Sequence, residues 1–506
     1  MPSAPQGNRG LQPEGGPSIG PAVRMRPAWG ALILVATLLF LWLYATAPRN
    51  MLRAVEGALL LVPAAVLLRH GSLGLLYVAP LVFSFGGADI GLGHFHPTFA
   101  TLFCFAVTIL WLLEKIVRDE SFRIPWKAGL GVCLMAAAVQ TVSIALSVHV
   151  CGQHVWNAIR EGWSLFLFMP VALVTVDRVR TGSQALWLVR SIVLSLLVTA
   201  ASGIFEYLGI EGFSRIDIEL GYVYRGRVDA SFPGANVFAG FLELTVPVAL
   251  GLALHEKSRA WRTLSLAAFA AGFAATLFTF SRGGFLMTVL GSVLVLAVRF
   301  RRRPALPAAF LALIVYVMAS NAHVFARQLS LVTEPSDVVN QPTLVHRYIT
   351  YRSFWNDFLD RPWTGVGWGA LGFFTGRTQI YTFWDIRHTI STSDIPHFGG
   401  GNSLFLNQAV KGGIVSLVSL ALLVAGVTAA AVFSMRRGRS TAAMAMVCSL
   451  VGFAGHQLVD HLLRWPQINA FFWLGIGTMI SLSIPENPAS PEGVDGSGLG
   501  GIRREG

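Results

Sequence analysis

The sequence predicts an all-α, polytopic integral membrane protein with about 12 to 14 transmembrane helices and a long loop before the last three spans. Of its 506 residues, 54% are hydrophobic and only 13% are charged, and the mean hydropathy is +0.60. Soluble domains average about a quarter charged residues, so this composition argues against a soluble enzyme. The apolar residues also occur in runs of about 18 to 22, the length that crosses about 30 Å of hydrocarbon as a helix.

The first predicted span follows a polar tail. Residues 1–27 are rich in Pro and Gly, which predicts a disordered cytoplasmic tail, and 485–506 are predicted to form a second one. The first apolar run, Trp29–Ala47, ends in small residues that imitate a signal-peptidase site, so a cleaved signal is the alternative to an uncleaved span. Its length exceeds the roughly 7 to 15 residues of a signal core, which favours the span.

Thirteen further apolar runs follow along the chain, and the Gly-rich run 73–87 is short enough to be a re-entrant or broken segment. The predicted spans are 51–68, 73–87, 98–116, 127–148, 156–176, 185–209, 234–254, 262–281, 283–300, 305–321, 402–433, 441–458 and 467–484.

The net charge of +12 reflects topology and does not indicate a nucleic-acid partner. Basic residues gather in alternate connections, for example Lys257–Arg262 and Arg299–Arg303, which makes that side and both termini cytoplasmic by the positive-inside rule. The opposite side holds the two long connections, 210–233 and 322–401. We therefore divide the chain into an N-terminal bundle over 28–209 and a second transmembrane region over 210–484 that contains the loop 322–401.

Candidate site residues lie on the side opposite the basic connections. Arg225, Arg227 and Asn236 surround a Pro-Gly turn before a span, where guanidinium groups and helix N-terminal amides would bind an anion. The alternative is a pair of interfacial arginines with an N-cap. Arg282 lies in the tight turn Ser281–Gly284, at a membrane depth where a charge is costly unless it is paired or functional. A plain glycine hairpin is the alternative for that turn.

The long loop carries the next candidates. A helix is predicted over Thr343–Leu359, where Arg347 could offer a bidentate fork to a phosphate and Arg352 would lie nearby. Pairing of these arginines with the acidic residues at the end of the helix is the structural alternative. His397 and Asn402 precede the span 402–433, and His is the usual proton acceptor near neutral pH, although a lone loop His is often incidental.

A weaker group lies at the end of the span 441–458 and could face the same cavity. It comprises His456, Asp460, His461 and Arg464. No thiol or carboxylate cluster accompanies it, so the sequence predicts neither a metal nor another cofactor.

Taken in order, these blocks resemble the bacterial O-antigen ligase and O-antigen polymerase superfamily. The matching pieces are Arg225–Ala239, Ser281–Gly284, Arg347–Gly369, and Asn402 with Leu404, Gly412 and Gly413. The resemblance covers about 225–430, while the first two hundred residues match only as repeated spans. In this resemblance Arg282 and Arg347 correspond to the arginines that contact the lipid diphosphate.

The resemblance implies an inverting, metal-independent glycosyltransferase of the bacterial inner membrane whose active site faces the periplasm. It would polymerise undecaprenyl-diphosphate-linked oligosaccharide repeat units into exopolysaccharide or O-antigen, beside a chain-length regulator and a flippase. His397 would orient or deprotonate the acceptor hydroxyl, while Arg225, Arg282 and Arg347 hold the diphosphate. Ligases of the superfamily carry His immediately before the Asn, and Gly401 stands there in this chain, which favours a polymerase.

Two alternatives remain open from the sequence. One is a ligase that transfers polysaccharide from undecaprenyl diphosphate to lipid A core or to protein. The other, of a different class, is a transporter or flippase of lipid-linked sugars. Charges inside the apolar runs support the transporter, although they could equally pair between helices. These charges are Arg160, Glu161, Arg190, Glu206 and Glu243.

Overall fold

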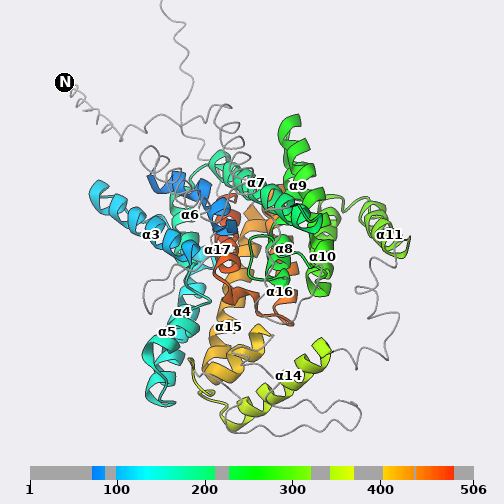
Figure 1. The fold of residues 1–506 in the computed structure, drawn as a ribbon. Coiled ribbons are helices and arrows are strands. Elements are labelled where there is room, and N and C mark those ends of the chain that lie inside the picture. The colour runs from blue at the N-terminus through cyan, green and yellow to red at the C-terminus, as the bar shows by residue number, and fades with distance from the viewer. Residues whose placement is uncertain are drawn as a thin grey trace, which may run out of the picture. The chain divides into compact units, whose positions relative to one another are not determined.

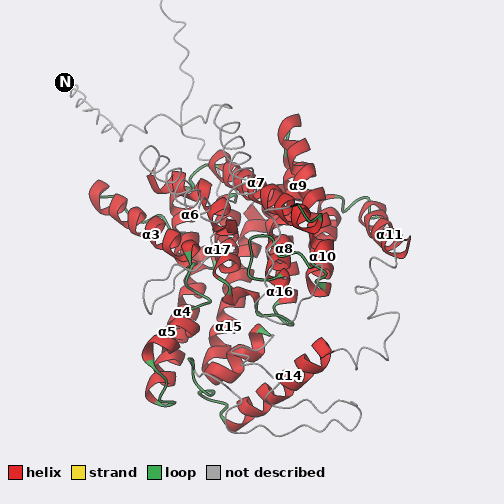
Figure 2. Ribbon diagram, viewed as in Figure 1, coloured by secondary structure: helices red, strands yellow, loops and turns green. Residues whose placement is uncertain are grey.

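The protein is described by a computed structural model that covers residues 71–85, 98–210, 227–320, 342–369, 403–437 and 440–483 (Figure 1). In this part of the chain the regular elements are helices, and no strand occurs (Figure 2). Seven of the described helices are long and apolar enough to cross a membrane. The fold is therefore that of an all-α, polytopic integral membrane protein, as the sequence predicts. The predicted tails and the spans Trp29–Ala47 and 51–68 lie outside the described residues.

The helices begin and end close to the predicted limits of the apolar runs. In chain order they are Gly71–Phe85, α3 (Phe99–Arg118), α4 (Leu130–His149), α5 (Val155–Gly162), α6 (Met169–Arg178), α7 (Gly182–Tyr207), α8 (Ala235–His255), α9 (Arg259–Phe278), α10 (Arg282–Arg299), α11 (Ala305–Ser320), α14 (Pro342–Asp360), α15 (Leu404–Arg437), α16 (Thr441–His456) and α17 (Pro466–Ser481), with the 3₁₀ helices η1 (Trp126–Ala128) and η3 (Leu462–Arg464). The helix predicted over Thr343–Leu359 corresponds to α14.

The predicted continuous span 156–176 is wrong. The chain forms two short helices there, α5 and α6, which are separated by turns over residues 163–168. Pro170 in the first turn of α6 suits a helix start, because proline lacks the amide that a helix interior needs. Side chains of α17 satisfy the turn, since Asn469 Nδ2 donates to the Ser164 carbonyl at 2.7 Å and Trp473 Nε1 donates to the Leu165 carbonyl at 2.9 Å.

Helix α8 lies at the centre of the described helices, and almost every residue along it is buried. It packs against α7, α9, α10 and α16 (Figure 1). Gly251 lets α16 approach closely, because a Cβ at this position would overlap the Ala445 side chain. Ser449 Oγ also donates to the Leu244 carbonyl at 2.7 Å. Small residues and hydroxyl hydrogen bonds are the usual means of holding helices together in lipid, where apolar burial alone gives little preference for protein contacts.

A second close helix pair joins α4 to α15. Gly426 faces Cys133, and Ser419 Oγ donates to the Ala136 carbonyl at 2.7 Å. The outward faces of the described helices carry large apolar side chains, including Val117 at 82% and Tyr316 at 69% exposure. Such a surface suits hydrocarbon and would be unfavourable in water.

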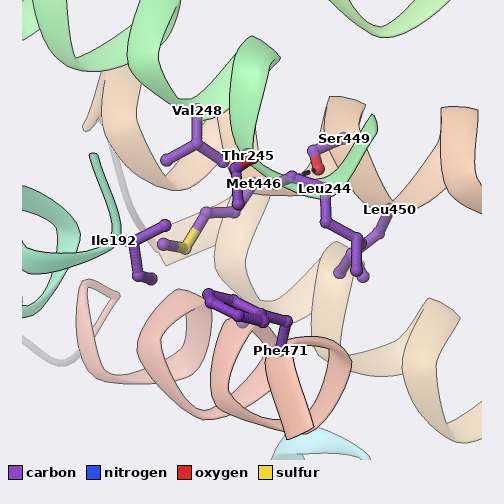
Figure 3. A pocket seen from close by; sticks show the side chains of 9 residues that line it. Ile192, Leu244, Thr245, Val248, Met446, Ser449, Leu450 and Phe471 are labelled. Atoms are coloured by element: carbon purple, nitrogen blue, oxygen red, sulfur yellow. Dashed lines mark hydrogen bonds between the residues drawn. The ribbon is translucent and has the colours of Figure 1, made fainter. Parts of the chain in front are cut away.

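A small internal cavity of about 20 Å³ lies between α7, α8, α16 and α17 (Figure 3). Its walls are apolar side chains such as Ile192, Met446 and Phe471. The two hydroxyls in its lining are already bonded to backbone carbonyls, Thr245 to Phe241 at 2.7 Å and Ser449 to Leu244 at 2.7 Å. The cavity is therefore a gap in helix packing and offers no free polar group to a substrate.

An ion pair joins α7 to the end of α8 at the end of the bundle that carries the basic connections. Arg190 Nε contacts Glu256 Oε1 at 2.7 Å, and the guanidinium lies 4.8 Å from the Trp187 ring and 4.9 Å from the Trp261 ring. Both charged side chains are largely buried, at 14% and 4% exposure. Arg190 is one of the charges that supported the transporter alternative. It pairs with Glu256 between helices.

Replacing Arg190 by Met should destabilise the protein by about 3 kcal/mol, because Glu256 would remain buried without its partner. Thermal unfolding in detergent would measure this. The double variant Arg190→Met/Glu256→Met should recover most of the loss, while Arg259→Met, at an exposed position on α9, should change little. Equal effects of the Arg190 and Arg259 variants would contradict the structural role of the pair.

Candidate active site

The candidate site lies at one end of the bundle, where α8, α10, α15 and α17 begin and α9 and α16 end. We call this the site end. Val228 N donates to the Phe278 carbonyl at 3.2 Å, which ties the segment before α8 to the end of α9. Leu404 N donates to the Gln457 carbonyl at 2.9 Å, which ties the start of α15 to the end of α16. Segments that are far apart in sequence are therefore adjacent here.

A chain of polar contacts crosses the site end from Arg227 to Asp460. Arg227 Nε donates to the Thr279 carbonyl at 2.8 Å, and its Nη2 donates to Asn236 Oδ1 at 2.7 Å. Asn236 Nδ2 in turn donates to Asp460 Oδ2 at 3.0 Å. All of these side chains are half-buried. Two predicted binding residues are thus brought together, and they are joined to a carboxylate from the far end of the sequence.

The turn that carries Arg282 is built by its neighbouring residues. Ser281 caps α10, because its Oγ accepts a hydrogen bond from Gly284 N at 3.3 Å, and Arg282 follows as the first helical residue. Gly283 packs on a histidine, since a Cβ there would lie 2.6 Å from His456 Nε2. A Cβ at Gly284 would overlap the Ala239 side chain. Both glycines are therefore required for the close approach of α10 to α8 and α16.

A carboxylate and an imidazole pair directly beneath this turn. His456 Nδ1 lies 2.5 Å from Glu243 Oε1, and the two side chains are 2% and 0% exposed. The pair joins α16 to α8 in the membrane-spanning region, where an isolated charge would be costly. The Ser281–Gly284 turn packs directly on this pair, through Gly283 against His456. Glu243 is the second intramembrane charge that proves to be paired between helices.

Arg347 approaches the same histidine from α14. Its charge and that of Asp460 both act on the His456 imidazole. On the next helical turn, Tyr351 donates its hydroxyl to the Val459 carbonyl at 3.4 Å, which holds α14 against the end of α16. Burial raises the pKa of Tyr351, while Arg347 lowers it and Asp460 raises it further. The start of α10, which carries Arg282, and Arg347 of α14 therefore both lie near His456.

After α14 the chain packs on a break in α15. Gly413 has φ 62° and ψ −156°, which interrupts the helix. The segment 362–369 pairs with the interrupted backbone: Val366 N donates to the Val410 carbonyl at 2.8 Å and Gly367 N to the Lys411 carbonyl at 3.0 Å. In the other direction, Ile414 N donates to the Pro362 carbonyl at 2.7 Å. The glycine-rich motif of the long loop thus replaces the missing helical hydrogen bonds of α15.

Trp368 anchors this segment to α4. Its side chain is 1% exposed, its Nε1 donates to Ser143 Oγ at 3.1 Å, and its backbone N donates to Ser147 Oγ at 2.9 Å. Next along the chain, Gly369 N donates to Glu161 Oε2 at 2.9 Å. Glu161 also forms an ion pair with Lys411, which is 1% exposed. One carboxylate therefore joins α5, the loop segment and the broken part of α15.

The structure places the predicted site residues in three groups. Arg227, Asn236, Arg282 and Arg347 lie together around Asp460 and the Glu243–His456 pair. Arg352 is exposed on α14, on a different turn from Arg347. The remaining predicted residues, Arg225, His397 and Asn402, lie outside the described residues.

Neither a role for Lys411 nor the contact between Asn236 and Asp460 is predicted from the sequence. A lysine immediately before two glycines inside an apolar run was the available signal for Lys411, because a charge at that depth requires a partner. Asn236 and Asp460 are 224 residues apart, and their contact has no local signal in the sequence.

Comparison with known proteins adds one observation to this geometry. Residues 267–421 match a family model described as O-antigen ligase. The match supports the predicted resemblance to the O-antigen ligase and polymerase superfamily. No curated protein matches the chain. The matched residues 267–421 include Arg282, Arg347 and the broken part of α15, whereas Asn236, His456 and Asp460 lie beyond these limits.

This match supports a function of the O-antigen ligase or polymerase type in general, within a family of membrane glycosyltransferase-like enzymes. It also points to lipid-linked polysaccharide substrates in a membrane. The site geometry agrees with that chemistry, because guanidinium groups of arginine are well suited to bind phosphate oxygens through paired hydrogen bonds.

Within the matched residues 267–421, the structure should not tolerate a side chain at Gly365. This residue has φ 65°, and a Cβ would overlap the Val410 carbonyl oxygen and the Lys411 backbone. Gly365→Ala should lower the unfolding free energy by more than about 1 kcal/mol and loosen the loop segment from α15. Gly475→Ala is the matched control, since a Cβ there meets nothing within 4 Å. Equal thermal stability of the two variants would contradict the packing described.

His461 should make stability depend on pH. Burial, together with the charges of Arg464 and Lys411, lowers its pKa to about 3. Because the folded-state pKa lies below the usual 6.5, the unfolded state binds the proton first and acidification favours unfolding. Stability should fall from about pH 6.5 downward, by up to about 1.4 kcal/mol per pH unit. Thermal unfolding of His461→Gln between pH 7 and 5 should show a shallower decline than wild type; identical slopes would exclude this contribution.

Proposed function

We propose that the protein is a periplasmic-face glycosyltransferase that polymerises undecaprenyl-diphosphate-linked oligosaccharide repeat units into exopolysaccharide or O-antigen. The observation that carries the proposal is that the start of α10, which carries Arg282, and Arg347 of α14 both lie near His456. One arginine is at the first residue of α10 and the other is on the loop helix α14. A diphosphate between them would meet two guanidinium groups and the amides at the start of a long helix, a combination that favours anions.

In the proposed reaction, a hydroxyl of the incoming repeat unit attacks the anomeric carbon of the growing chain from the face opposite the diphosphate. The carbon–oxygen bond to the diphosphate breaks, and undecaprenyl diphosphate leaves with the bonding electron pair. Arg282 and Arg347 stabilise the charge that develops on the departing phosphate, a role that requires no metal. Arg225 and Arg352 would contact the same lipid-linked substrate, and His397 would orient the acceptor hydroxyl together with Asn402.

Arg227 and Asn236 contribute to this site by position. Arg227 donates hydrogen bonds to the Thr279 carbonyl and to Asn236 Oδ1. These two bonds connect the start of α8 to the end of α9. Since α9 leads directly into the turn that carries Arg282, the contact would keep that turn in place. We propose that both residues line the substrate cavity.

The proposed setting follows from the topology. The basic connections would face the cytoplasm of the bacterial inner membrane with both termini, and the site end would face the periplasm. The region 210–484, including the loop 322–401, would contain the active site, and the bundle 28–209 would support it. A chain-length regulator and a flippase of lipid-linked sugars are the expected partners.

A ligase is the second candidate, because the matching family model is described as O-antigen ligase. Gly401, where ligases of the superfamily carry His, favours the polymerase. A transporter has less support, since three of the charges that suggested one are engaged: Glu161 pairs with Lys411, Arg190 with Glu256, and Glu243 with His456. Glu206 likewise accepts a hydrogen bond from Ala230 N at 2.8 Å.

Replacing Arg282 or Arg347 by Ala should lower polymer formation by about 100-fold or more, because each arginine would stabilise the charge that develops as the diphosphate departs. The measurement is conversion of lipid-linked repeat units, extracted from the native host, into polymer by the purified protein in liposomes. Arg259→Ala, exposed at the opposite end of α9, should leave the rate unchanged. Normal polymer from both site variants would refute the proposed site, and transfer that occurs only when a lipid A core acceptor is added would identify a ligase.

A further inference from the structure

The proposed transfer requires a group that takes the proton of the acceptor hydroxyl, and this inference rests on that proposed function. A suitable group must be basic at neutral pH and must be reachable from the site end. Four acidic or histidine side chains of the described residues lie at or beside the end of α16. They are Glu243, His456, Asp460 and His461.

Three of the four are enclosed. Glu243 and His456 bind each other and are 1% and 2% exposed, and His461 is 3% exposed. Asp460 differs, because it is half-buried and follows the last turn of α16 outside the helix. A substrate hydroxyl could therefore approach Asp460 without displacing the helix contacts that bury the others.

The surroundings of Asp460 orient its carboxylate. Asn236 Nδ2 donates to Oδ2 at 3.0 Å, and the Asp460 backbone N donates to the His456 carbonyl at 2.8 Å. Its charge acts on Tyr351 of α14, on His456 of α16 and on Arg464 of η3. Asp460 thus lies where the elements that carry the arginines meet, and a side-chain amide holds one of its oxygens.

We propose that Asp460 is the catalytic base that accepts the proton of the acceptor hydroxyl. As the hydroxyl oxygen bonds to the anomeric carbon, its proton passes to the Asp460 carboxylate. The bond between that carbon and the phosphate oxygen breaks at the same time, so the diphosphate leaves with the electron pair. Asn236 fixes the carboxylate and is the positioning residue for this step.

Asp460 lies outside residues 267–421, so the match to the O-antigen ligase model does not assign it a role. The sequence also separates it from the arginines of the long loop by more than a whole span. Only the fold brings it next to the predicted diphosphate site.

The decisive variant is Asp460→Asn, because asparagine keeps a side-chain oxygen that can still accept the Asn236 hydrogen bond but is not basic. We expect the rate constant for polymer formation to fall by about 100-fold or more, while binding of undecaprenyl diphosphate changes less than about twofold. Asp360→Asn, an exposed carboxylate at the end of α14, is the matched control and should retain the wild-type rate.

A second variant separates base catalysis from a structural role. In Asp460→Ala, added formate should restore part of the rate, because a small carboxylate can occupy the vacated space and accept the proton. Formate should not affect Arg282→Ala. Wild-type turnover in Asp460→Asn, or no formate rescue of a folded Asp460→Ala protein, would overturn the proposal. Absence of transfer by the wild-type protein, or normal transfer by Arg282→Ala, would instead overturn the proposed function.

Discussion

The break in α15 at Gly413 is the constraint on which the site end depends. In a bilayer, each backbone amide and carbonyl needs a partner inside the protein, so a broken helix is tolerated only where other groups satisfy it. Here the segment 362–369 supplies the partners, with Val366 and Gly367 as donors and Pro362 as acceptor. The loop is therefore fixed to the membrane-spanning region by backbone hydrogen bonds, and the helix α14 that precedes it is held at this end. The position of Arg347 follows from that attachment.

Paired charges hold the other elements of the site end together. The Glu243–His456 pair joins α8 to α16, and the Glu161–Lys411 pair joins α5 to α15. Breaking such a pair leaves a charge in a poorly solvated position, which penalises separation of the two helices strongly. The turn before α10 rests directly on the first pair through Gly283. Arg282 is thus placed by a buried contact between two other helices.

The sequence predicted the helices well because apolar run length is a local property. It failed at 156–176, where the run continues through turns that Asn469 and Trp473 stabilise from the far end of the chain. The same limit applies to the site. Arg282 could be selected because a charge at membrane depth is uncommon without a partner or a role, and Arg347 because an arginine at the start of the loop helix can offer two hydrogen bonds to a phosphate. The link between Asn236 and Asp460 depends on the packing of α8 against α16, and no pattern around either residue indicates it.

The division of the site between two parts of the chain follows the chemistry of the proposed reaction. In the proposed reaction the lipid diphosphate is the leaving group whatever repeat unit it carries, and Arg282 and Arg347 lie within the residues that match the family model. Acceptor sugars differ from one polysaccharide to another. Asp460, which would receive the acceptor's proton, and Asn236, which positions it, lie outside the matched residues, after α16 and on α8. Because α8 packs on both α10 and α16, the two halves of the proposed site contact the same helix, which would relate the acceptor side to the diphosphate side.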